Sequence, residues 1–449
     1  MRLITILLRL VGGLLLALLL LLAVSLAPVD DTPYRQTAYY AQTKARLAQL
    51  PAPPRPTAPL RAGWAKVNLT TPYTTPTGGY GVRRGRHWTT VSDSVYARAI
   101  VLDNGATRVA LVSLDLLITP PTVAEQLKKR LPEVGLRWES VFMGAIHTHN
   151  SLGAWAPRLA GSLFSGDFEP RVVDHITETV LRAIRQAQAG LAPVQVGYEQ
   201  ADAAGVLYNR LDAHYPVDGP IRLLKLTKPD GTAALLTTFA GHATVLDAKK
   251  SLQYLSRDYP GAFVDRLERE TGAFAVFMAG AVGSMGPREQ GTDDFDALRT
   301  YADTLVTLAQ PALGRFRLRT DSTLVMQTLP LGLREPHARV IGNWRVRPWL
   351  FHSAYGDYPS DLKALRIGTT VLIGTPCDFS GELALPLVAY ARRRGLNLMV
   401  TSFNGGYIGY VTPDQYYNKD AYETRTMNWF GPYNGAYFTE LIQGLLEKV

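Results

Sequence analysis

The sequence predicts an α/β protein in which one large domain of mixed β-sheets flanked by helices follows an N-terminal hydrophobic helix. Short apolar runs typical of strands alternate with longer amphipathic stretches from residue 63 onward, with no second linker and no sequence repeat. A hairpin signal at Asn104-Gly105 interrupts this alternation, which favours mixed sheets over a purely parallel one. Hydrophobic residues make up 47% of the 449 residues, enough for a large core.

Residues 1–27 are predicted to be a membrane anchor or a signal segment. Arg2 and Arg9 precede an uncharged run, residues 10–27, that is long enough to cross a thin bilayer as a helix. Basic residues on the near side favour a cytoplasmic N-terminus, with the rest of the chain on the periplasmic or extracellular side. The segment could instead be a cleaved signal peptide that leaves a secreted protein, although Pro28 would hinder cleavage.

Residues 28–62 are predicted to form a stalk or linker. Thr32-Pro33 could begin a short helix that ends near Leu50. The proline-rich run 51–59 then favours a stiff, extended spacer. This spacer is expected to hold the following domain away from the membrane.

The remaining residues, 63–449, are predicted to form one domain. Its expected strands lie at 96–103, 107–114, 140–146, 195–198, 221–227, 233–239, 273–278, 369–373 and 397–403. Its expected helices lie at 123–130, 171–189, 260–271, 295–310 and 381–394. Residues 335–358 have no clear period and are interpreted as a loop over the functional site.

Charge and cysteine content limit the classes of function. The formal net charge is +9, and residues 28–449 carry 45 − 38 = +7 of it, which suits either an anionic membrane surface as a partner or an ordinary solvated surface. The basic residues are scattered and form no dense run interleaved with aromatics, so nucleic-acid binding is not expected. The single cysteine, Cys377, excludes an intramolecular disulfide and a zinc site built from several thiolates.

The sharpest local pattern is His147-Thr148-His149, which directly follows an apolar strand. If that strand continues, residues two apart point to the same face, and both imidazoles can reach one site. Imidazole is a good zinc ligand at neutral pH. The same pair also fits two histidines in a polar loop, so the pattern needs partners before it indicates a metal site.

Three further polar side chains, His242, Asp378 and Tyr410, each follow the end of a predicted strand with glycine nearby. Strand ends are where sheet proteins collect their functional groups. Two histidines and a carboxylate form a catalytic zinc set with an open position. Taken singly, the three residues also fit a core histidine, a helix cap and a packing tyrosine, and the residues alone do not join them.

Six stretches, in order, resemble motifs of the neutral/alkaline (non-lysosomal) ceramidases. They are AGWAKVNLT at 62–70, YGVRRG at 80–85, HTHNSLG at 147–153, YNR at 208–210, FAGHAT at 239–244 with LSRDYPG at 255–261, and GYVTP at 409–413 with AYET at 421–424 and FGPY at 430–433. Each stretch is weak alone, but the ordered set covers nearly all of the predicted domain. The resemblance identifies residues 63–449 as a catalytic domain.

The resemblance implies a zinc-dependent hydrolase that cleaves an amide bond, in ceramide or another N-acyl lipid, by attack of a zinc-bound hydroxide. The implied residues are His147, His242, Asp378 and Tyr410 as zinc ligands, His149 as general acid and base, Tyr422 as support for the oxyanion, and Arg210 and Asp258 as residues that bind substrate or brace its pocket. A membrane surface and a lipid are the implied partners.

The sequence departs from the family pattern at three places. The family's glutamate ligand is Asp378 here, so Glu382, one helical turn on, is a rival ligand. The family's aspartate and serine in the next conserved loop are Ser284 and Gly286. No stretch after the last motif resembles the family's C-terminal immunoglobulin-like domain. These departures bear on the lipid substrate more than on the metal.

Two other functions fit the same residues. One is a metallohydrolase of the same fold that acts on a non-lipid amide or an ester. The other is a non-catalytic binding protein that has kept the pocket. A serine-nucleophile hydrolase is not expected, because the segment 282–286, VGSMG, lacks the first glycine of G-x-S-x-G.

Overall fold

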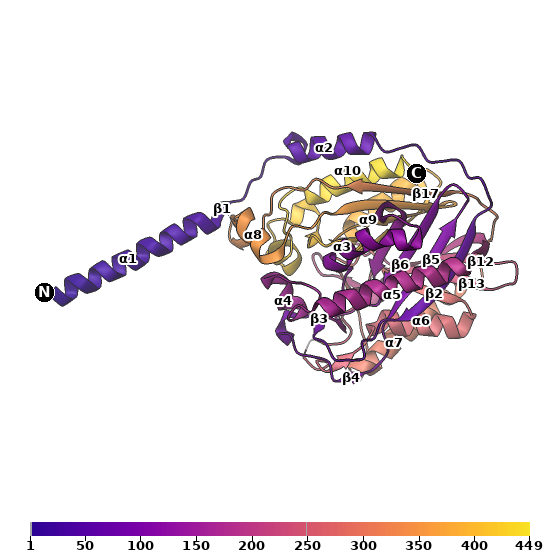
Figure 1. The fold of residues 1–449 in the computed structure, drawn as a ribbon, viewed down its shortest axis with the longest axis horizontal. Coiled ribbons are helices and arrows are strands. Elements are labelled where there is room, and N and C mark those ends of the chain that lie inside the picture. Colours follow the sequence, from indigo (N-terminus) through magenta and orange to yellow (C-terminus); the bar gives the residue numbers. More distant parts are fainter. Residues whose placement is uncertain (1, 248) are drawn as a thin grey trace.

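The computed structural model describes residues 2–247 and 249–449, so Met1, the first residue of the predicted anchor, lies outside the described residues (Figure 1). Its helices are α1 (Arg2–Ser25), α2 (Ala38–Ala48), α3 (Pro121–Arg130), α4 (Leu159–Ser165), α5 (Pro170–Ala189), α6 (Asp258–Thr271), α7 (Asp294–Leu313), α8 (Pro348–Tyr355), α9 (Gly381–Arg392) and α10 (Asn434–Leu446). Mixed sheets flanked by helices confirm the predicted α/β class.

Three main sheets share one strand order. The first sheet is β2 (Arg61–Asn68), β5 (Tyr96–Asp103), β6 (Arg108–Leu114) and β7 (Val141–Ala145), with the short β9 (Ala192–Pro193) added beside β2. The second is β10 (Gln195–Asp202), β12 (Pro220–Thr227), β13 (Ala233–Phe239) and β15 (Phe274–Ala279). The third is β17 (Leu324–Pro330), β20 (Asp361–Ile367), β21 (Thr370–Gly374) and β23 (Asn397–Thr401). In each sheet three successive strands pair antiparallel, and the third of them also pairs parallel with a fourth strand. The parallel pairs are β6 with β7, β13 with β15, and β21 with β23.

The chain therefore contains three units with the same order of elements, although no repeat is visible in the sequence. In each unit one helix connects the parallel strands (α3, α6 or α9) and a second follows them (α5, α7 or α10). Separate apolar clusters fill the space between each sheet and its two helices. A fourth cluster, which includes Leu111, Leu236 and Leu372, joins the inner faces of the three sheets. This arrangement brings the ends of the three parallel strand pairs together.

Smaller sheets connect these units. They are β1 (Leu26–Pro28) with β19 (Trp344–Val346) and β18 (Arg339–Ile341); β3 (Thr77–Gly79) with β8 (Asn150–Leu152); β4 (Thr90–Val91) with β14 (Tyr254–Leu255); β11 (Leu207–Asn209) with β16 (Met285–Pro287); and β22 (Asp378–Phe379) with β24 (Tyr410–Val411). Residues 335–358, interpreted from sequence as a loop, instead contain β18, β19 and α8. Helices α4 and α10, the main-sheet strands β2, β9, β17 and β20, and the other short strands were not predicted either.

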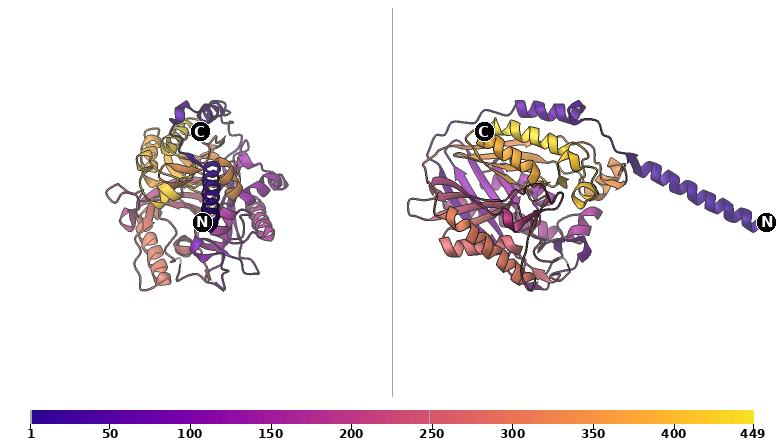
Figure 2. Two further views of the ribbon diagram at one scale, coloured as in Figure 1. Left: turned by 90° about the vertical axis from the view of Figure 1, so that its left-hand side faces the viewer. Right: turned by 180° about the vertical axis from the view of Figure 1, so that it is seen from behind.

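Helix α1 projects from the body as a single apolar rod (Figures 1 and 2). Its segment Leu3–Ser25 is long and apolar enough to cross a membrane, and none of it is buried within the protein. This is consistent with a signal anchor or a signal peptide. The division of the chain at residues 27 and 62 stays a prediction.

The predicted linker lies on the body rather than between the body and α1. Helix α2 packs against α10, where Tyr40 donates a hydrogen bond to Glu440 at 2.7 Å. Strand β1 pairs with β19 directly after α1 ends. Pairing and packing thus fix this segment to the body at β1 and α2, and the expectation that it holds the domain away from the membrane stays a prediction.

Candidate metal centre

The three units each contribute one polar side chain to a common point. His147 follows β7 of the first unit, His242 follows β13 of the second, and Asp378 follows β21 of the third. All three side chains are buried. Parallel strands end at one edge of a sheet, so the convergence of the three sheets places these side chains together.

The local conformation of His147 differs from the strand continuation that the H-x-H pattern suggested. Strand β7 ends at Ala145, and His147 has a φ of +69°, in the left-handed region that non-glycine residues rarely adopt. Its Nδ1 atom lies 2.7 Å from the carbonyl oxygen of Leu117. The ring of Phe403 stacks on the imidazole with centroids 4.1 Å apart. Such enforced conformations cluster at functional sites.

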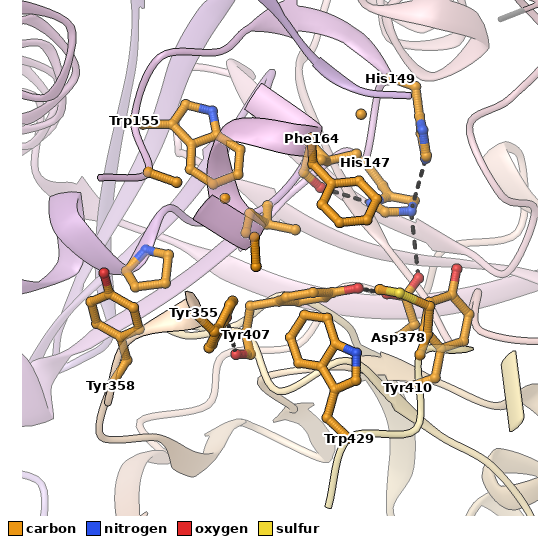
Figure 3. A pocket seen from close by; sticks show the side chains of 18 of the residues that line it. His147, His149, Trp155, Phe164, Tyr355, Tyr358, Asp378, Tyr407, Tyr410 and Trp429 are labelled. Atoms are coloured by element: carbon orange, nitrogen blue, oxygen red, sulfur yellow. Dashed lines mark hydrogen bonds and ion pairs between the residues drawn. The ribbon is translucent and has the colours of Figure 1, made fainter. Parts of the chain in front are cut away.

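Four polar atoms nevertheless meet at one place, as Figure 3 shows for three of the residues. The Nε2 atom of His147 lies 2.9 Å from Nε2 of His242 and 3.2 Å from Nε2 of His149. It also lies 3.4 Å from Oδ1 of Asp378. The three imidazoles together could hold a metal ion.

The protonation of these groups fits a metal ion at this point. Nδ1 of His147 donates to the Leu117 carbonyl, and Nδ1 of His242 lies 3.3 Å from the Val282 carbonyl. Burial lowers the pKa of His147 to about 3 and that of His242 well below its usual value, so both rings are neutral. Their Nε2 atoms then carry lone pairs that face each other. A cation between them would convert this repulsion into coordination.

Asp378 supplies a further acceptor atom that a cation at this point would stabilise. Its Oδ1 is buried and has no hydrogen-bond partner among the described residues, whereas Oδ2 accepts a hydrogen bond of 2.7 Å from the Tyr407 hydroxyl. Burial raises the pKa of Asp378 to about 7. A nearby cation would favour the ionised carboxylate. Tyr407 was not identified from the sequence, although it lies three residues before Tyr410.

The rival ligand Glu382 is engaged elsewhere. Its carboxylate accepts hydrogen bonds from Asn209 Nδ2 at 2.8 Å and from Ser380 Oγ at 3.0 Å, and also from the Ser284 hydroxyl. These three donors satisfy the buried carboxylate, as a structural role requires. The contrast with the unpartnered Oδ1 of Asp378 favours Asp378 as the acidic ligand.

His149 differs from the other two histidines at its second ring nitrogen. Its Nδ1 atom has no hydrogen-bond partner among the described residues. Metal-bound histidines usually donate that N–H to a carbonyl or carboxylate. The ring instead packs on Tyr80, with centroids 4.5 Å apart, and Arg83 donates a hydrogen bond to the His149 carbonyl. The lack of a side chain at Gly79 lets the backbones of residues 79 and 149 approach closely, because a Cβ on Gly79 would lie 2.8 Å from the His149 Cα.

Tyr410 and Tyr422 line the same pocket as His149. Their rings meet edge to face with centroids 5.8 Å apart. Tyr410 is buried, whereas Tyr422 is half-exposed. Arg210 interacts with the Tyr410 hydroxyl and forms an ion pair of 2.9 Å with Glu423. Arg210 therefore lies behind Tyr410 and does not line the pocket.

Asp258 also braces the site from behind. Its carboxylate accepts hydrogen bonds from the backbone N–H groups of Leu246, at 3.1 Å, and Tyr259, at 2.5 Å. These contacts hold the segment that follows His242. These hydrogen bonds give Asp258 a bracing position, and its expected role in substrate binding stays a prediction.

An apolar pocket opens next to the four converging atoms. Its walls are mainly aromatic and include Trp155, Phe164, Tyr355, Tyr358, Tyr407 and Trp429. Figure 3 shows His147, His149, Asp378 and Tyr410 at one end, with Trp155 and Tyr358 at the other. The sequence placed residues 335–358 over the site, and Tyr355 and Tyr358 do line it. Trp155 and Phe164 were missed, because nothing in their local sequence marks a pocket wall.

The model of the family described as neutral/alkaline non-lysosomal ceramidase, N-terminal, matches residues 62–292. The neutral ceramidase of Mycobacterium tuberculosis (strain ATCC 25618 / H37Rv) is 23% identical over 222 residues, which cover 45% of this chain and 34% of that protein. The chain thus spans about a third of the length of this curated relative.

Solved ceramidase structures share the fold. The crystal structure of neutral ceramidase from Pseudomonas aeruginosa matches with a TM-score of 0.74 at 19% identity, over 87% of this chain and 75% of that one. A ceramidase complexed with C2 matches with the same TM-score and identity, over 87% of this chain and 76% of that one.

Proposed function

Because this chain belongs to the neutral/alkaline non-lysosomal ceramidase family, we propose that it is a zinc-dependent hydrolase that cleaves the amide bond of ceramide or another N-acyl lipid. The observation that carries the proposal is the convergence of three imidazole Nε2 atoms and Oδ1 of Asp378 at one end of an aromatic pocket. Nitrogen and carboxylate donors suit zinc, and apolar walls suit an acyl chain.

The proposed ligands are His147, His242, Asp378 and Tyr410. The carbonyl contacts of the two histidines orient their Nε2 lone pairs toward the centre, and the Tyr407 hydroxyl orients Asp378. When bound, zinc supplies a water of lowered pKa and a positive charge for the substrate carbonyl oxygen.

Two other side chains carry the proton and the developing charge. His149 lines the pocket with a neutral ring and an unpartnered Nδ1, so it can take a proton from the attacking water and return it to the leaving amine. Tyr422 is half-exposed beside it and can donate a hydrogen bond to the oxygen of the tetrahedral intermediate.

Elemental analysis and a substrate panel test this function. The purified protein should contain about one zinc per chain, and a chelator should abolish hydrolysis until zinc is restored. The panel compares ceramide and other N-acyl lipids with water-soluble amides and esters. Hydrolysis of the soluble compounds alone would favour the non-lipid hydrolase. Bound zinc without any turnover would favour the binding protein.

Ser284 should not act as a nucleophile. It is fully buried, donates its hydroxyl hydrogen bond to Glu382, and does not line the pocket. We expect Ser284→Ala to lower kcat less than about tenfold, or ~1.4 kcal/mol of barrier. Rates should be normalised to folded protein, because the lost buried hydrogen bond costs about 1–3 kcal/mol of stability. A burst of covalent acyl-enzyme that disappears in Ser284→Ala would refute the zinc mechanism.

Gly286, at the position of the family's serine, is consistent with a mechanism that needs no side chain there. A Cβ on Gly286 would lie 2.4 Å from the Tyr208 ring, so a serine would require this ring to move.

We also propose that the domain is exported and that residues 10–27 anchor it, which the exposed apolar helix α1 supports. A mature protein that begins near Pro28 would show cleavage instead of anchoring.

A further inference from the structure

Exposed apolar side chains form a surface on segments at the end of the body from which α1 projects (Figure 1). We call it the platform. Its side chains are each 49–69% exposed, and they are Val82, Leu159, Leu163, Val340, Ile341, Trp344 and Trp349. They come from the segment Gly81–Arg83, from α4, and from the stretch between β18 and α8, and α4 contacts the other two segments. Grouped apolar exposure of this kind marks an interaction surface.

The platform is joined to α1 without a flexible spacer. Strand β1, which follows α1 directly, pairs with β19, where Pro28 lies opposite Trp344. Trp349 Nε1 donates a hydrogen bond of 2.9 Å to the carbonyl of Val24, and Arg347 Nε donates one of 3.2 Å to the carbonyl of Ala23. A bilayer crossed by α1 would therefore meet the platform at the same level.

The composition of the platform suits the boundary between lipid and water. Tryptophan is enriched at membrane interfaces, because its ring is apolar and its N–H is polar. Arg345 and Arg347 lie among these side chains, where they donate hydrogen bonds to backbone carbonyls, and their positive charge suits a surface of anionic headgroups. Aliphatic side chains beside them can enter the outer edge of the acyl region.

Helix α4 links the platform to the catalytic pocket. Leu159 and Leu163, four residues apart, share its exposed face. Ala160, Gly161 and Phe164 of the same helix line the pocket. Tyr355, at the end of α8, lines the pocket from the neighbouring helix. One short helix thus has one side on the platform and the other on the pocket wall.

We propose that the platform seats on the lipid bilayer that α1 enters, and that lipid substrate passes from this bilayer into the pocket beside α4. The seating follows from the contacts of α1 with the platform. The passage of substrate rests in addition on the proposed function.

Tryptophan fluorescence tests the seating without any need for activity. The full chain is placed in vesicles whose acyl chains carry bromine, which quenches tryptophans that enter the bilayer. We expect quenching in the wild type and loss of most of it in Trp344→Phe/Trp349→Phe. Trp64→Phe, on strand β2, is the matched control and should keep it. Equal quenching in the wild type and the double variant would overturn the proposal.

Charged substitutions test the passage of substrate. Leu163→Asp and Ile341→Asp should each lower turnover of a vesicle-embedded N-acyl lipid about tenfold, because an apolar contact with lipid is lost. Turnover of a water-soluble short-chain amide should not change. Val91→Asp, on strand β4, alters a comparably exposed valine away from the platform and should have neither effect.

Two outcomes separate the possible failures. Equal loss on both substrates in correctly folded variants would show that these side chains act on turnover in general and not on lipid entry, which would overturn the passage of lipid beside α4. A change of oligomeric state in the aspartate variants, with no quenching in the wild type, would make the platform a protein interface and refute the seating. Absence of all hydrolysis would refute the proposed function, and the fluorescence result would still decide the seating.

Discussion

Replacing His149 with alanine should lower kcat by about 10²–10⁴-fold and leave zinc bound. His149 lines the pocket, but no carbonyl or carboxylate fixes its Nδ1 atom. His147→Ala and His242→Ala should instead remove the metal, because each of these rings is oriented by a carbonyl and presents Nε2 to the centre. Zinc content and turnover are measured on the same samples.

An exposed histidine provides the control for these three substitutions. His214→Ala should change neither zinc content nor rate, because His214 lies on the surface. The proposed roles are reversed if His149→Ala strips zinc while His147→Ala retains it. The close approach of all three Nε2 atoms makes this a real alternative, which only the metal content can decide.

Replacing Tyr407 with phenylalanine should weaken zinc affinity about 10–100-fold, as is typical when a partner of a metal ligand is lost. The Tyr407 hydroxyl donates the 2.7 Å hydrogen bond to Oδ2 of Asp378 and so directs Oδ1 toward His147. We infer that Tyr407 is a positioning residue. The measurement is the zinc dissociation constant, obtained by competition with a chelator.

Recovery by excess zinc distinguishes positioning from a structural defect. At saturating zinc, Tyr407→Phe should regain most of the wild-type kcat, whereas a distorted pocket would remain slow. Tyr358→Phe is the matched control, because Tyr358 lines the same pocket at the end opposite Asp378. An unchanged zinc affinity in Tyr407→Phe would remove Tyr407 from the metal centre.

Elements with strong local patterns were predicted well from the sequence. The strand expected at 96–103 is β5, and the helix expected at 171–189 is α5 with one more residue. Strand β20 was missed because it contains Lys363, a residue that usually excludes a buried position. Its ammonium group is buried and donates hydrogen bonds to the carbonyls of Trp138 and Val141, and burial lowers its pKa to about 8.

The ordered motifs of the family selected His147, His242 and Asp378, which the structure brings together, whereas their local geometry was not predicted. The H-x-H pair was expected on a continuing strand, but His147 has left-handed backbone geometry and its ring stacks on Phe403. Phe403 lies 256 positions further along the chain, so no local sequence pattern could reveal this contact. Tyr407 and Asp378 instead meet within the third unit, where β22 pairs with β24. Contacts between units depend on how three sheets pack, and no periodicity within one segment specifies that packing.

The meeting of three units at one point makes metal binding a property of the assembled molecule. His147, His242 and Asp378 belong to different units, so a unit that folds in isolation holds only one of these donors. Chelation becomes available only after the units dock, and the free energy of docking and the free energy of coordination are thermodynamically linked. If zinc binds as proposed, its affinity reports on tertiary assembly, and a substitution far from the pocket that loosens the contact between units should be detectable as metal loss before the individual units unfold.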